Sequence, residues 1–463
     1  MTPPIPAAVR RSLRETFGFT ELRHGQQDVI ARVLKGRHTL AIMPTGAGKS
    51  LCYQLPALHL DGATIVVSPL ISLMKDQAEK LVEAGVVAEQ LNSAQKASEQ
   101  GASMDRIAEE ESAIVFATPE RLADPDFRAA MADRKVALLV IDEAHCISQW
   151  GHDFRPAYLE IGAALEAFGH PTVLALTATA TDDVVEDIRH QLRLPDMHVV
   201  NTGMYRPNLR LQVAQVTNEG EQFDRLLEAL RRTAGGGIVY TATVKACVEL
   251  HERLRAAGES VTLYHGKLAT ADRNANQDAF MTGARRVMVA TNAFGMGIDK
   301  PDIRFVIHYQ MPGSAQAYYQ EAGRAGRDGE HADCVLVFNR KDRQVQQFFL
   351  ARRYPGVDDL RRLVDLLETL PAGVGLHLSE LVERSGGIPK TRASVALSLL
   401  RDAGLVHCDT RHGWRRAATK SPTHPALAAL AADYARKSER DHEALERMVF
   451  YAQTGFCRWR VLL

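Results

Sequence analysis

Short apolar runs alternate along the chain with longer amphipathic stretches. These runs are rich in Val, Ile and Leu, and several of them end at Thr, Ser or Pro. The first series comprises His38–Met43, Ala63–Ser68, Ala113–Ala117, Val136–Asp142 and Thr172–Leu176. Such runs, separated by helix-length segments, are typical of strands buried in a parallel sheet and joined by crossover helices. The pattern therefore predicts an α/β lobe in the first part of the chain.

A second series of apolar runs begins after a junction near Val200–Asn208. Its members are Gly237–Tyr240, Ser260–Tyr264, Arg286–Ala290, Arg304–Tyr309 and Asp333–Phe338. The same reasoning predicts a second parallel-sheet lobe.

The segment after about Pro355 has a different pattern. Helices are expected at Leu360–Leu370, at Leu378–Ser385 and from Pro389 to about Ala403, with a hairpin in LVHCDTRHGWRRA. Three short helices followed by a hairpin are typical of a winged helix. Its basic residues would grip a duplex backbone, although a solvated helix face on a packing module is the alternative. The final stretch, Pro425–Leu463, is predicted to be mostly helical.

The composition narrows the class of protein but not its partner. The 463 residues are 46% hydrophobic and 24% charged, as in a soluble globular protein of several domains. Because the net charge is zero, the evidence for a nucleic-acid partner must come from local patches. No apolar stretch is long enough to span a bilayer, and the N-terminus lacks the pattern of a signal peptide. We therefore expect a cytoplasmic protein without a membrane partner.

The cysteines occur singly and form no C-x-x-C pair. They are Cys52, Cys146, Cys247, Cys334, Cys408 and Cys457. This spacing excludes a disulfide framework and a complete zinc site, and most of the thiols are expected to be buried.

A phosphate loop follows the first apolar run. The run leads into Pro44-Thr45-Gly46-Ala47-Gly48-Lys49-Ser50, and a helix is expected next. Glycines let backbone N–H groups turn toward phosphate oxygens, and the N-terminus of a helix adds positive potential. Lys49 would contact the β- and γ-phosphates, and Ser50 would hold Mg²⁺. The strict pattern has glycine where this chain has Met43, which a tighter loop would tolerate.

Two carboxylates end the fourth run, in Asp142-Glu143-Ala144-His145. A carboxylate at the end of a buried strand is costly unless a cation balances it. Asp142 is therefore a candidate Mg²⁺ ligand, and Glu143 is placed to polarise the attacking water. We expect His145 to couple this site to the other lobe.

Two further signals fit an ATP site. Thr177-Ala178-Thr179 offers hydroxyl groups at the end of an apolar run. In the second lobe, Arg324 and Arg327 are three residues apart and share one face of a helix. They are candidates for arginine fingers that stabilise charge on the transferring phosphoryl group, with solvent-facing arginines as the alternative.

These motifs together resemble those of superfamily 2 helicases of the DEAH-box type, and their detailed amino-acid sequences resemble those of the RecQ family. The similar sequence segments are FGF at Phe17–Phe19, RHGQQ at Arg23–Gln27, MPTGAGKSLCYQLPA from Met43, VVSPLISLMKDQ from Val66, DEAHCISQWGHDFRP from Asp142, ATNAFGMGIDKPDIRFVIHY from Ala290 and YYQEAGRAGRDG from Tyr318. The resemblance covers roughly residues 8–340. It implies two tandem RecA-like lobes and ATP-dependent 3′–5′ unwinding of DNA in repair or recombination. Single-stranded and duplex DNA are then the partners, while protein partners are unknown.

The resemblance also implies roles that spacing alone does not give. Gln26 matches the residue that reads the adenine edge, and Phe19 and Arg23 match positions that sandwich the adenine ring. The segment Cys146–Pro156 matches the aromatic-rich loop of the family. Its candidate DNA-binding residues are Trp150, His152, Phe154 and Arg155. Aromatic rings stack on unpaired bases and arginine adds charge, whereas Trp150 and Phe154 as ordinary core residues are the alternative.

The chain departs from the family after the second lobe, where a zinc module with four cysteines is usual. The last residues, TGFCRWRVLL, resemble the family's sequence around the first zinc-binding cysteine, and Cys457 occupies the position of that cysteine. We expect that the chain is cut there and that Cys457 does not hold zinc in it. Loss of the module and a compact variant with reordered accessory parts are the alternatives.

The predicted domains are residues 1–205 and 206–345 for the two lobes, 346–420 for the winged-helix-like domain and 421–463 for a helical segment. The nucleotide site is assigned to Phe19, Arg23, Gln26, Thr45, Gly46, Gly48, Lys49, Ser50 and Asp142, and catalysis to Lys49, Asp142, Glu143, Arg324 and Arg327, with Ser50 and Asp142 as Mg²⁺ ligands. Two other functions stay open: an ATPase that remodels RNA or nucleoprotein, and a DNA-binding regulator that uses ATP only as a switch.

Overall fold

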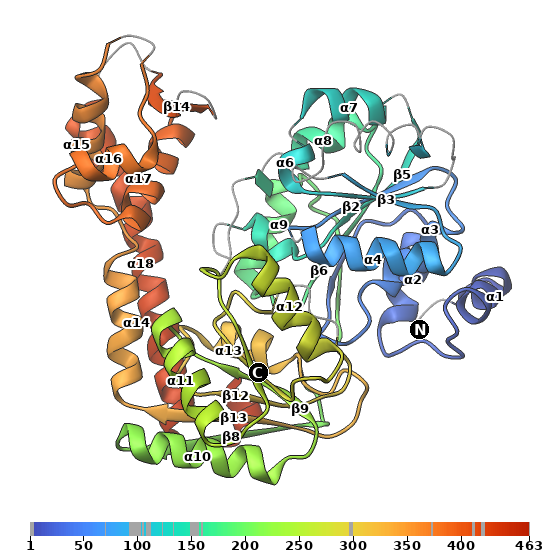
Figure 1. The fold of residues 1–463 in the computed structure, drawn as a ribbon. Helices are drawn as coiled ribbons and strands as arrows, with labels where there is room; N and C mark the ends of the chain where they lie inside the picture. Colours follow the sequence, from blue (N-terminus) through green and yellow to red (C-terminus); the bar gives the residue numbers. More distant parts are fainter. Residues whose placement is uncertain are drawn as a thin grey trace.

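The structure is a computed structural model with two sheet lobes and a small domain carried on a helical stalk (Figure 1). It describes residues 4–69, 71–91, 103, 106–107, 113–122, 124–132, 134–148, 157–158, 161–295, 300–371, 374–409, 413–417 and 422–462. None of the helices in these ranges combines the length and the apolar content that a membrane crossing requires.

The first lobe is built on a parallel sheet in the order β3-β4-β2-β5-β6-β1-β7. Its strands are β1 Thr39–Ile42, β2 Ala63–Val67, β3 Ala88–Leu91, β4 Ile114–Ala117, β5 Val136–Ile141, β6 Thr172–Thr177 and β7 His198–Asn201. The strands β1, β2 and β4 are buried along their whole length, because helices cover both faces of the sheet. The helices are α1 Ala7–Glu15, α2 Gln26–Val33, α3 Leu51–Ala57, α4 Ile71–Glu83, α6 Pro119–Leu122, α7 Pro125–Ala132, the 3-10 helix η1 Ala144–Ile147, α8 Ile161–Ala167 and α9 Asp182–Gln191.

The second lobe repeats this design with a parallel sheet in the order β10-β11-β9-β12-β13-β8. Its strands are β8 Leu209–Val216, β9 Gly236–Tyr240, β10 Val261–Tyr264, β11 Val287–Ala290, β12 Ile303–His308 and β13 Ala332–Asn339. The helices are α10 Glu219–Arg232, α11 Val244–Ala256, α12 Thr270–Met281 and α13 Ala315–Ala322. The two parallel-sheet lobes expected from the apolar runs are confirmed.

The pattern of apolar runs does not predict three of the strands, and all three are edge strands. β3 and β7 are the two edge strands of the first sheet, and β8 is an edge strand of the second. An edge strand has a neighbour on one side only, so polar residues remain exposed along it. β8 has the sequence LRLQVAQV and is half-exposed along its middle, so it shows no continuous apolar run.

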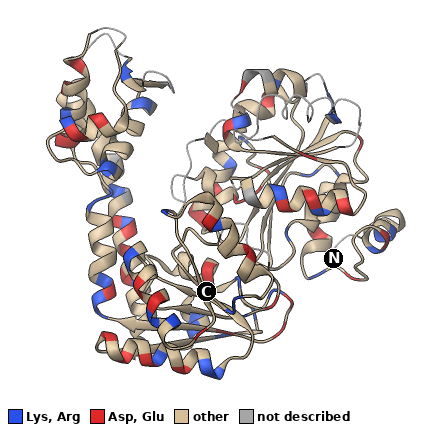
Figure 2. Cartoon of the chain, in the orientation of Figure 1, with Lys and Arg blue, Asp and Glu red and all other residues tan. Residues whose placement is uncertain are grey.

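The accessory part stands on two helices that pack side by side, α14 Lys341–Ala351 and α18 His424–Gln453 (Figure 1). Between them in sequence come α15 Val357–Glu368, α16 Leu378–Arg384, α17 Lys390–Asp402, β14 Val406–Asp409 and β15 Gly413–Arg416, and the short helix α19 Arg458–Leu462 follows α18. The three helices and the hairpin lie where the sequence predicts them. Acidic and basic residues are interspersed along the stalk and over both lobes, in keeping with the zero net charge (Figure 2).

The helix α18 belongs to two hydrophobic cores. Near its start, Leu427 and Ala431 are buried with the apolar residues of α15 and α17. Near its end, Leu445, Met448 and Tyr451 are buried with residues of the second lobe. One helix therefore joins the winged-helix-like domain to the second lobe.

Candidate active site between the two lobes

The phosphate loop leaves the carboxyl end of β1 and enters α3. Gly46 and Gly48 have φ angles of +85° and +78°, which is the left-handed region that favours glycine. A Cβ atom at Gly48 would lie 2.5 Å from Nε2 of Gln26. Both glycines are therefore required by the conformation of the loop, which agrees with the sequence pattern.

Lys49 is held at the centre of this loop. Its Nζ donates to the carbonyl oxygen of Met43 at 3.2 Å. Burial lowers the pKa of Lys49, while Glu143 and Asp142 act in the opposite direction. The side chain of Met43 is buried, with its Sδ 4.0 Å from Sγ of Cys52. The departure from the strict motif therefore leaves the loop intact, because the side chain at this position points into the core.

The two carboxylates follow β5 and face the phosphate loop. Burial and the neighbouring Glu143 raise the pKa of Asp142 to about 6, although Lys49 lowers it. Oγ of Ser68 donates to Oδ2 of Asp142 at 3.4 Å, and the Tyr158 hydroxyl donates to the Asp142 carbonyl at 3.0 Å. Glu143 has a φ of +49°, which is uncommon for a residue with a side chain.

His145 connects these carboxylates to the end of β6. Its Nδ1 lies 3.3 Å from Oε2 of Glu143 and 3.1 Å from Oγ1 of Thr177. The Thr177 hydroxyl in turn donates to the carbonyl oxygen of Thr179 at 3.0 Å. These partners all lie in the first lobe, so the expected coupling of His145 to the second lobe stays a prediction.

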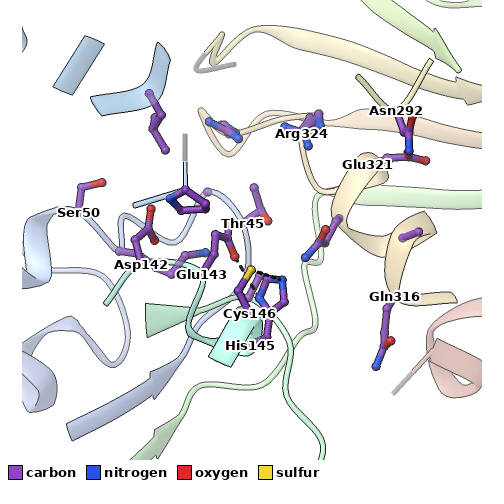
Figure 3. Close-up of a pocket in the computed structure, with 18 of the residues that line it drawn as sticks. Thr45, Ser50, Asp142, Glu143, His145, Cys146, Asn292, Gln316, Glu321 and Arg324 are labelled. Carbon is purple, nitrogen blue, oxygen red and sulfur yellow. Dashed lines mark hydrogen bonds and ion pairs between the residues drawn. The ribbon is translucent and has the colours of Figure 1, made fainter. Parts of the chain in front are cut away.

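The second lobe contributes the turn after α13 to the same cleft (Figure 3). Nη1 of Arg324 donates to the carbonyl oxygen of Gly295, while Nε of Arg324 is buried without a hydrogen-bond partner among the described residues. A Cβ atom at Gly46 would lie 3.3 Å from Cγ of Arg327. Arg327 thus lies against the phosphate loop, whereas Arg324 is tied to its own lobe.

The residues assigned to the adenine also line this cleft. Nε2 of Gln26 donates to the carbonyl oxygens of Ala47 and Gly48, at 3.1 and 2.9 Å. Nη1 of Arg23 donates to the carbonyl oxygen of Gly46. Phe19 is 51% exposed, so its ring face is open to solvent. Gln26 and Arg23 therefore contact the phosphate loop itself, which the sequence did not indicate.

The residues present fit a magnesium–nucleoside triphosphate. The loop presents left-handed glycines and a buried lysine, and a buried N–H of Arg324 has no partner among the described residues. Burial and the adjacent Glu143 raise the pKa of Asp142, and a divalent cation bound there would offset both effects. Oγ of Ser50, the other candidate Mg²⁺ ligand, accepts a hydrogen bond from Nε2 of Gln77 at 3.2 Å.

Two site residues were missed by the sequence analysis. Gln77 donates a hydrogen bond to Ser50. It is the last residue of the segment from Val66 that resembles the family, so that resemblance could have pointed to Gln77. Arg206 lies in the junction between the lobes and donates to the carbonyl oxygen of Thr45. A single arginine in a polar connection has no periodicity or spacing that would mark it.

The candidate DNA-binding residues Trp150, His152, Phe154 and Arg155 lie outside the described residues. In the winged-helix-like domain, Arg392 donates to the carbonyl oxygen of Ala351 at 2.8 Å and lies 3.4 Å from Asp359. Arg392 is thus held by contacts within this part of the chain, and the expected grip of the domain on a duplex backbone stays a prediction. Cys457 is exposed, and the described part of the chain holds no cluster of three or more His, Cys, Asp or Glu residues that fits a metal ion.

Two family models match the lobes that build this site. The model described as DEAD/DEAH box helicase matches residues 23–188. The model described as helicase conserved C-terminal domain matches residues 221–329.

Two relatives identify the family more closely. The ATP-dependent DNA helicase RecQ of Bacillus subtilis is 45% identical over 365 residues, which cover 77% of this chain and 61% of that protein. The probable ATP-dependent DNA helicase RecS of the same bacterium is 40% identical over 395 residues, covering 84% of this chain and 79% of that protein. The chain belongs to the RecQ family. This RecQ-family chain thus spans less than two thirds of the length of the first relative.

A solved structure supports the fold at lower identity. The DUF1998 helicase MrfA bound to DNA has a TM-score of 0.60 at 18% identity, covering 92% of this chain and 64% of that chain. At this identity the likeness shows the fold alone. It supports the assignment of two RecA-like lobes to this member of the RecQ family.

Proposed function

We propose that this chain is an ATP-dependent DNA helicase that hydrolyses ATP to move along single-stranded DNA and unwind duplex DNA. The observation that carries the proposal is the convergence of three parts in one interlobe cleft: the phosphate loop, the carboxylates after β5 and the arginine turn after α13. A site divided between two lobes is remade each time they close, so phosphate chemistry can be converted into relative movement of the lobes.

Each part has a distinct role in the proposed reaction. The glycine loop and Lys49 bind the phosphates, and Ser50 and Asp142 hold Mg²⁺, which would neutralise charge on the phosphate oxygens. Glu143 orients and polarises the attacking water. Arg327, with Arg324 beside it, offsets the charge that develops on the transferring group.

The nucleic-acid partner is proposed from the family. The matched relatives are named as DNA helicases, and the segment Cys146–Pro156 carries the aromatic and basic residues suited to unpaired bases. We propose 3′–5′ polarity and a role in DNA repair or recombination on the same grounds. A cytoplasmic location is consistent with these partners.

The test measures ATP hydrolysis and strand displacement by the parent chain and by Lys49→Ala. The parent should hydrolyse ATP only with Mg²⁺, faster when single-stranded DNA is added, and should separate a duplex with a 3′ overhang. Lys49→Ala should lose both activities, because it removes the cation that contacts the phosphates.

Three other results separate the alternatives. Hydrolysis that responds to RNA but not to DNA would favour the RNA remodeller. DNA-stimulated hydrolysis without strand displacement would favour a nucleoprotein remodeller. ATP binding that changes DNA affinity without turnover would favour the regulator that uses ATP as a switch.

A further inference from the structure

Arg206 is the buried arginine of the connection between β7 and β8, and it lies outside the residues that the two family models match. Its side chain is 8% exposed. A guanidinium group is always charged and carries five N–H donors, so burial requires acceptors for them. The partners of this side chain therefore indicate what the residue does.

Within the described part of the chain, its hydrogen bonds go to main-chain carbonyl oxygens in the two halves of the candidate site. Nη1 donates to Thr45 at 3.1 Å and to Gly323 at 2.6 Å. Nη2 donates to Ala325 at 2.8 Å and to Gly326 at 2.6 Å. One guanidinium group thus bridges the phosphate loop and the turn that carries Arg324 and Arg327.

Three of these four acceptors belong to the second lobe, and the connection itself is fixed there. The Tyr319 hydroxyl on α13 donates to the carbonyl oxygen of Met204 at 2.6 Å. Nδ2 of Asn208 donates to the carbonyl oxygens of Gly326 and Glu330, at 2.8 and 2.9 Å. The side chain of Arg206 therefore holds the shape of the arginine turn, and its bond to Thr45 reaches across to the first lobe.

Arg206 and Arg327 lie side by side against the phosphate loop. A Cβ atom at Gly46 would lie 3.3 Å from Cγ of Arg327 and 3.5 Å from Nη1 of Arg206. A Cβ atom at Gly323 would lie 3.3 Å from Cβ of Thr45, so the turn and the loop are in direct contact. A shift of the turn would therefore move Arg327 relative to bound phosphates.

We propose that Arg206 is a positioning residue for ATP hydrolysis: it fixes the turn Gly323–Gly326 against the phosphate loop and thereby places Arg327 at the transferring phosphoryl group. This inference rests on the proposed function and deepens it. The bond to Thr45 joins the turn to the phosphate loop of the first lobe, so the turn and the loop are held together in this structure.

The chemistry of the bridge requires arginine. The two terminal nitrogens point their N–H groups in different directions in one plane, which lets them serve four carbonyl oxygens at once. Lysine keeps the charge but has one nitrogen, and it cannot span the same acceptors. Arg206→Lys therefore keeps the positive charge and removes the set of hydrogen bonds, so it tests the contribution of the hydrogen bonds alone.

The experiment compares the full chain with Arg206→Lys, in the parent and in an Arg327→Ala background. Because the fingers act on the transition state, Arg206→Lys should lower kcat about a hundredfold while KM for ATP changes by less than about threefold. In the Arg327→Ala background the same substitution should lower kcat only a few-fold, since the finger that it positions is absent. Arg210→Lys is the matched control and should leave kcat unchanged, because the exposed Arg210 on β8 pairs with Asp333 on β13.

A second readout does not depend on turnover. The affinity for ADP with aluminium fluoride, a mimic of the transferring phosphoryl group, should fall in Arg206→Lys, while the affinity for ADP alone should stay within about threefold. A parent that hydrolyses ATP but does not separate DNA strands would refute the proposed helicase function, while the lower kcat and weaker transition-state-analogue binding of Arg206→Lys would still support the positioning role.

Asn208→Ala covers the case in which Arg206→Lys does not fold. It removes a second donor to the same turn from a half-buried position, and it should lower kcat in the same direction by a smaller factor. Equal loss of kcat in both backgrounds, or a raised KM with normal kcat, would overturn the proposal.

Discussion

The two lobes share one strand order and differ in the segment that comes after the first strand. The order in the first sheet is β1-β6-β5-β2-β4-β3, and the order in the second is β8-β13-β12-β9-β11-β10. When the strands of each lobe are numbered from its first strand, the two orders are the same. The first sheet has one additional edge strand, β7, beside β1. β1 is followed by the phosphate loop and α3. β8 is followed by Thr217 and Asn218, and the Asn218 side chain caps α10 by accepting from the N–H of Glu221 at 2.9 Å.

The comparison shows that topology places the strand ends and the following residues decide the chemistry. In the first lobe, the ends of β1 and β5 carry the lysine and the two carboxylates. In the second lobe, the corresponding end of β8 carries an ordinary helix cap, and the groups facing the cleft come from the turn after α13. If this division of labour is right, substitutions at matching positions of the two lobes will have very different effects.

The sharpest test of the second lobe is Arg327→Ala. We expect kcat for ATP to fall by about a thousandfold with ATP affinity nearly unchanged, because an arginine finger acts mainly on transition-state charge. Arg324→Ala should have a smaller effect, since Arg324 is bonded to Gly295 in its own lobe. Steady-state kinetics and equilibrium ATP binding measure the two quantities, with Arg225→Ala on the exposed face of α10 as the control. An effect confined to ATP affinity would contradict the role.

The matching test of the first lobe is Glu143→Gln. Hydrolysis should fall by roughly several hundredfold while ATP binding is kept, because the substitution removes the base that orients water but keeps the volume of the side chain. Single-turnover hydrolysis and nucleotide binding would be compared with Glu186→Gln, an exposed glutamate on α9. Hydrolysis at the parent rate would show that the catalytic carboxylate is a different residue.

A third test asks whether DNA reaches the first lobe directly. The segment Cys146–Pro156 begins three residues after Glu143, so a base stacked on Trp150 has a short route to the carboxylates. Trp150→Ala should reduce DNA stimulation of hydrolysis about tenfold, since stacking on one base is worth about 1–3 kcal/mol. Basal hydrolysis should be kept and DNA binding should weaken only modestly, because backbone charges elsewhere supply most of the affinity. Trp150→Phe, which keeps an aromatic face, should retain most of the stimulation.

The outcome for Trp150 has a clear alternative. Equal loss of basal hydrolysis, stimulation and binding would mean that Trp150 is a core residue. Normal stimulation with normal unwinding would mean that the loop is not the sensor of DNA.

The central strands were predictable from the sequence because burial on both faces leaves a continuous apolar run. β2, β4 and β5 lie within a residue or two of the predicted ranges. β8 was not predictable in this way, because an edge strand keeps polar residues on its exposed positions. β10 is also an edge strand, but it was predicted because its sequence VTLY keeps a short apolar run.

The candidate site was predictable where its chemistry depends on residues close in sequence. The phosphate loop and the Asp142–Glu143 pair are local motifs, so their spacing was enough. Gln26 bonding the phosphate loop and Arg206 bridging the lobes depend on how distant segments pack, and no local pattern encodes such contacts.

The smallest expected effect comes from Asn218→Ala, at the position of the second lobe that corresponds to the phosphate loop. The substitution removes the hydrogen bond from the N–H of Glu221 to Oδ1 of Asn218, and loss of a helix cap costs about 1 kcal/mol. Hydrogen exchange of the amides in the first turn of α10 should therefore accelerate about fivefold. Asn218→Ser, which keeps a capping oxygen, should restore most of the protection, and kcat and KM for ATP should stay at parent values in both variants. A fall in kcat after Asn218→Ala would mean that this strand end takes part in the chemistry, and the division between the two lobes would then be wrong.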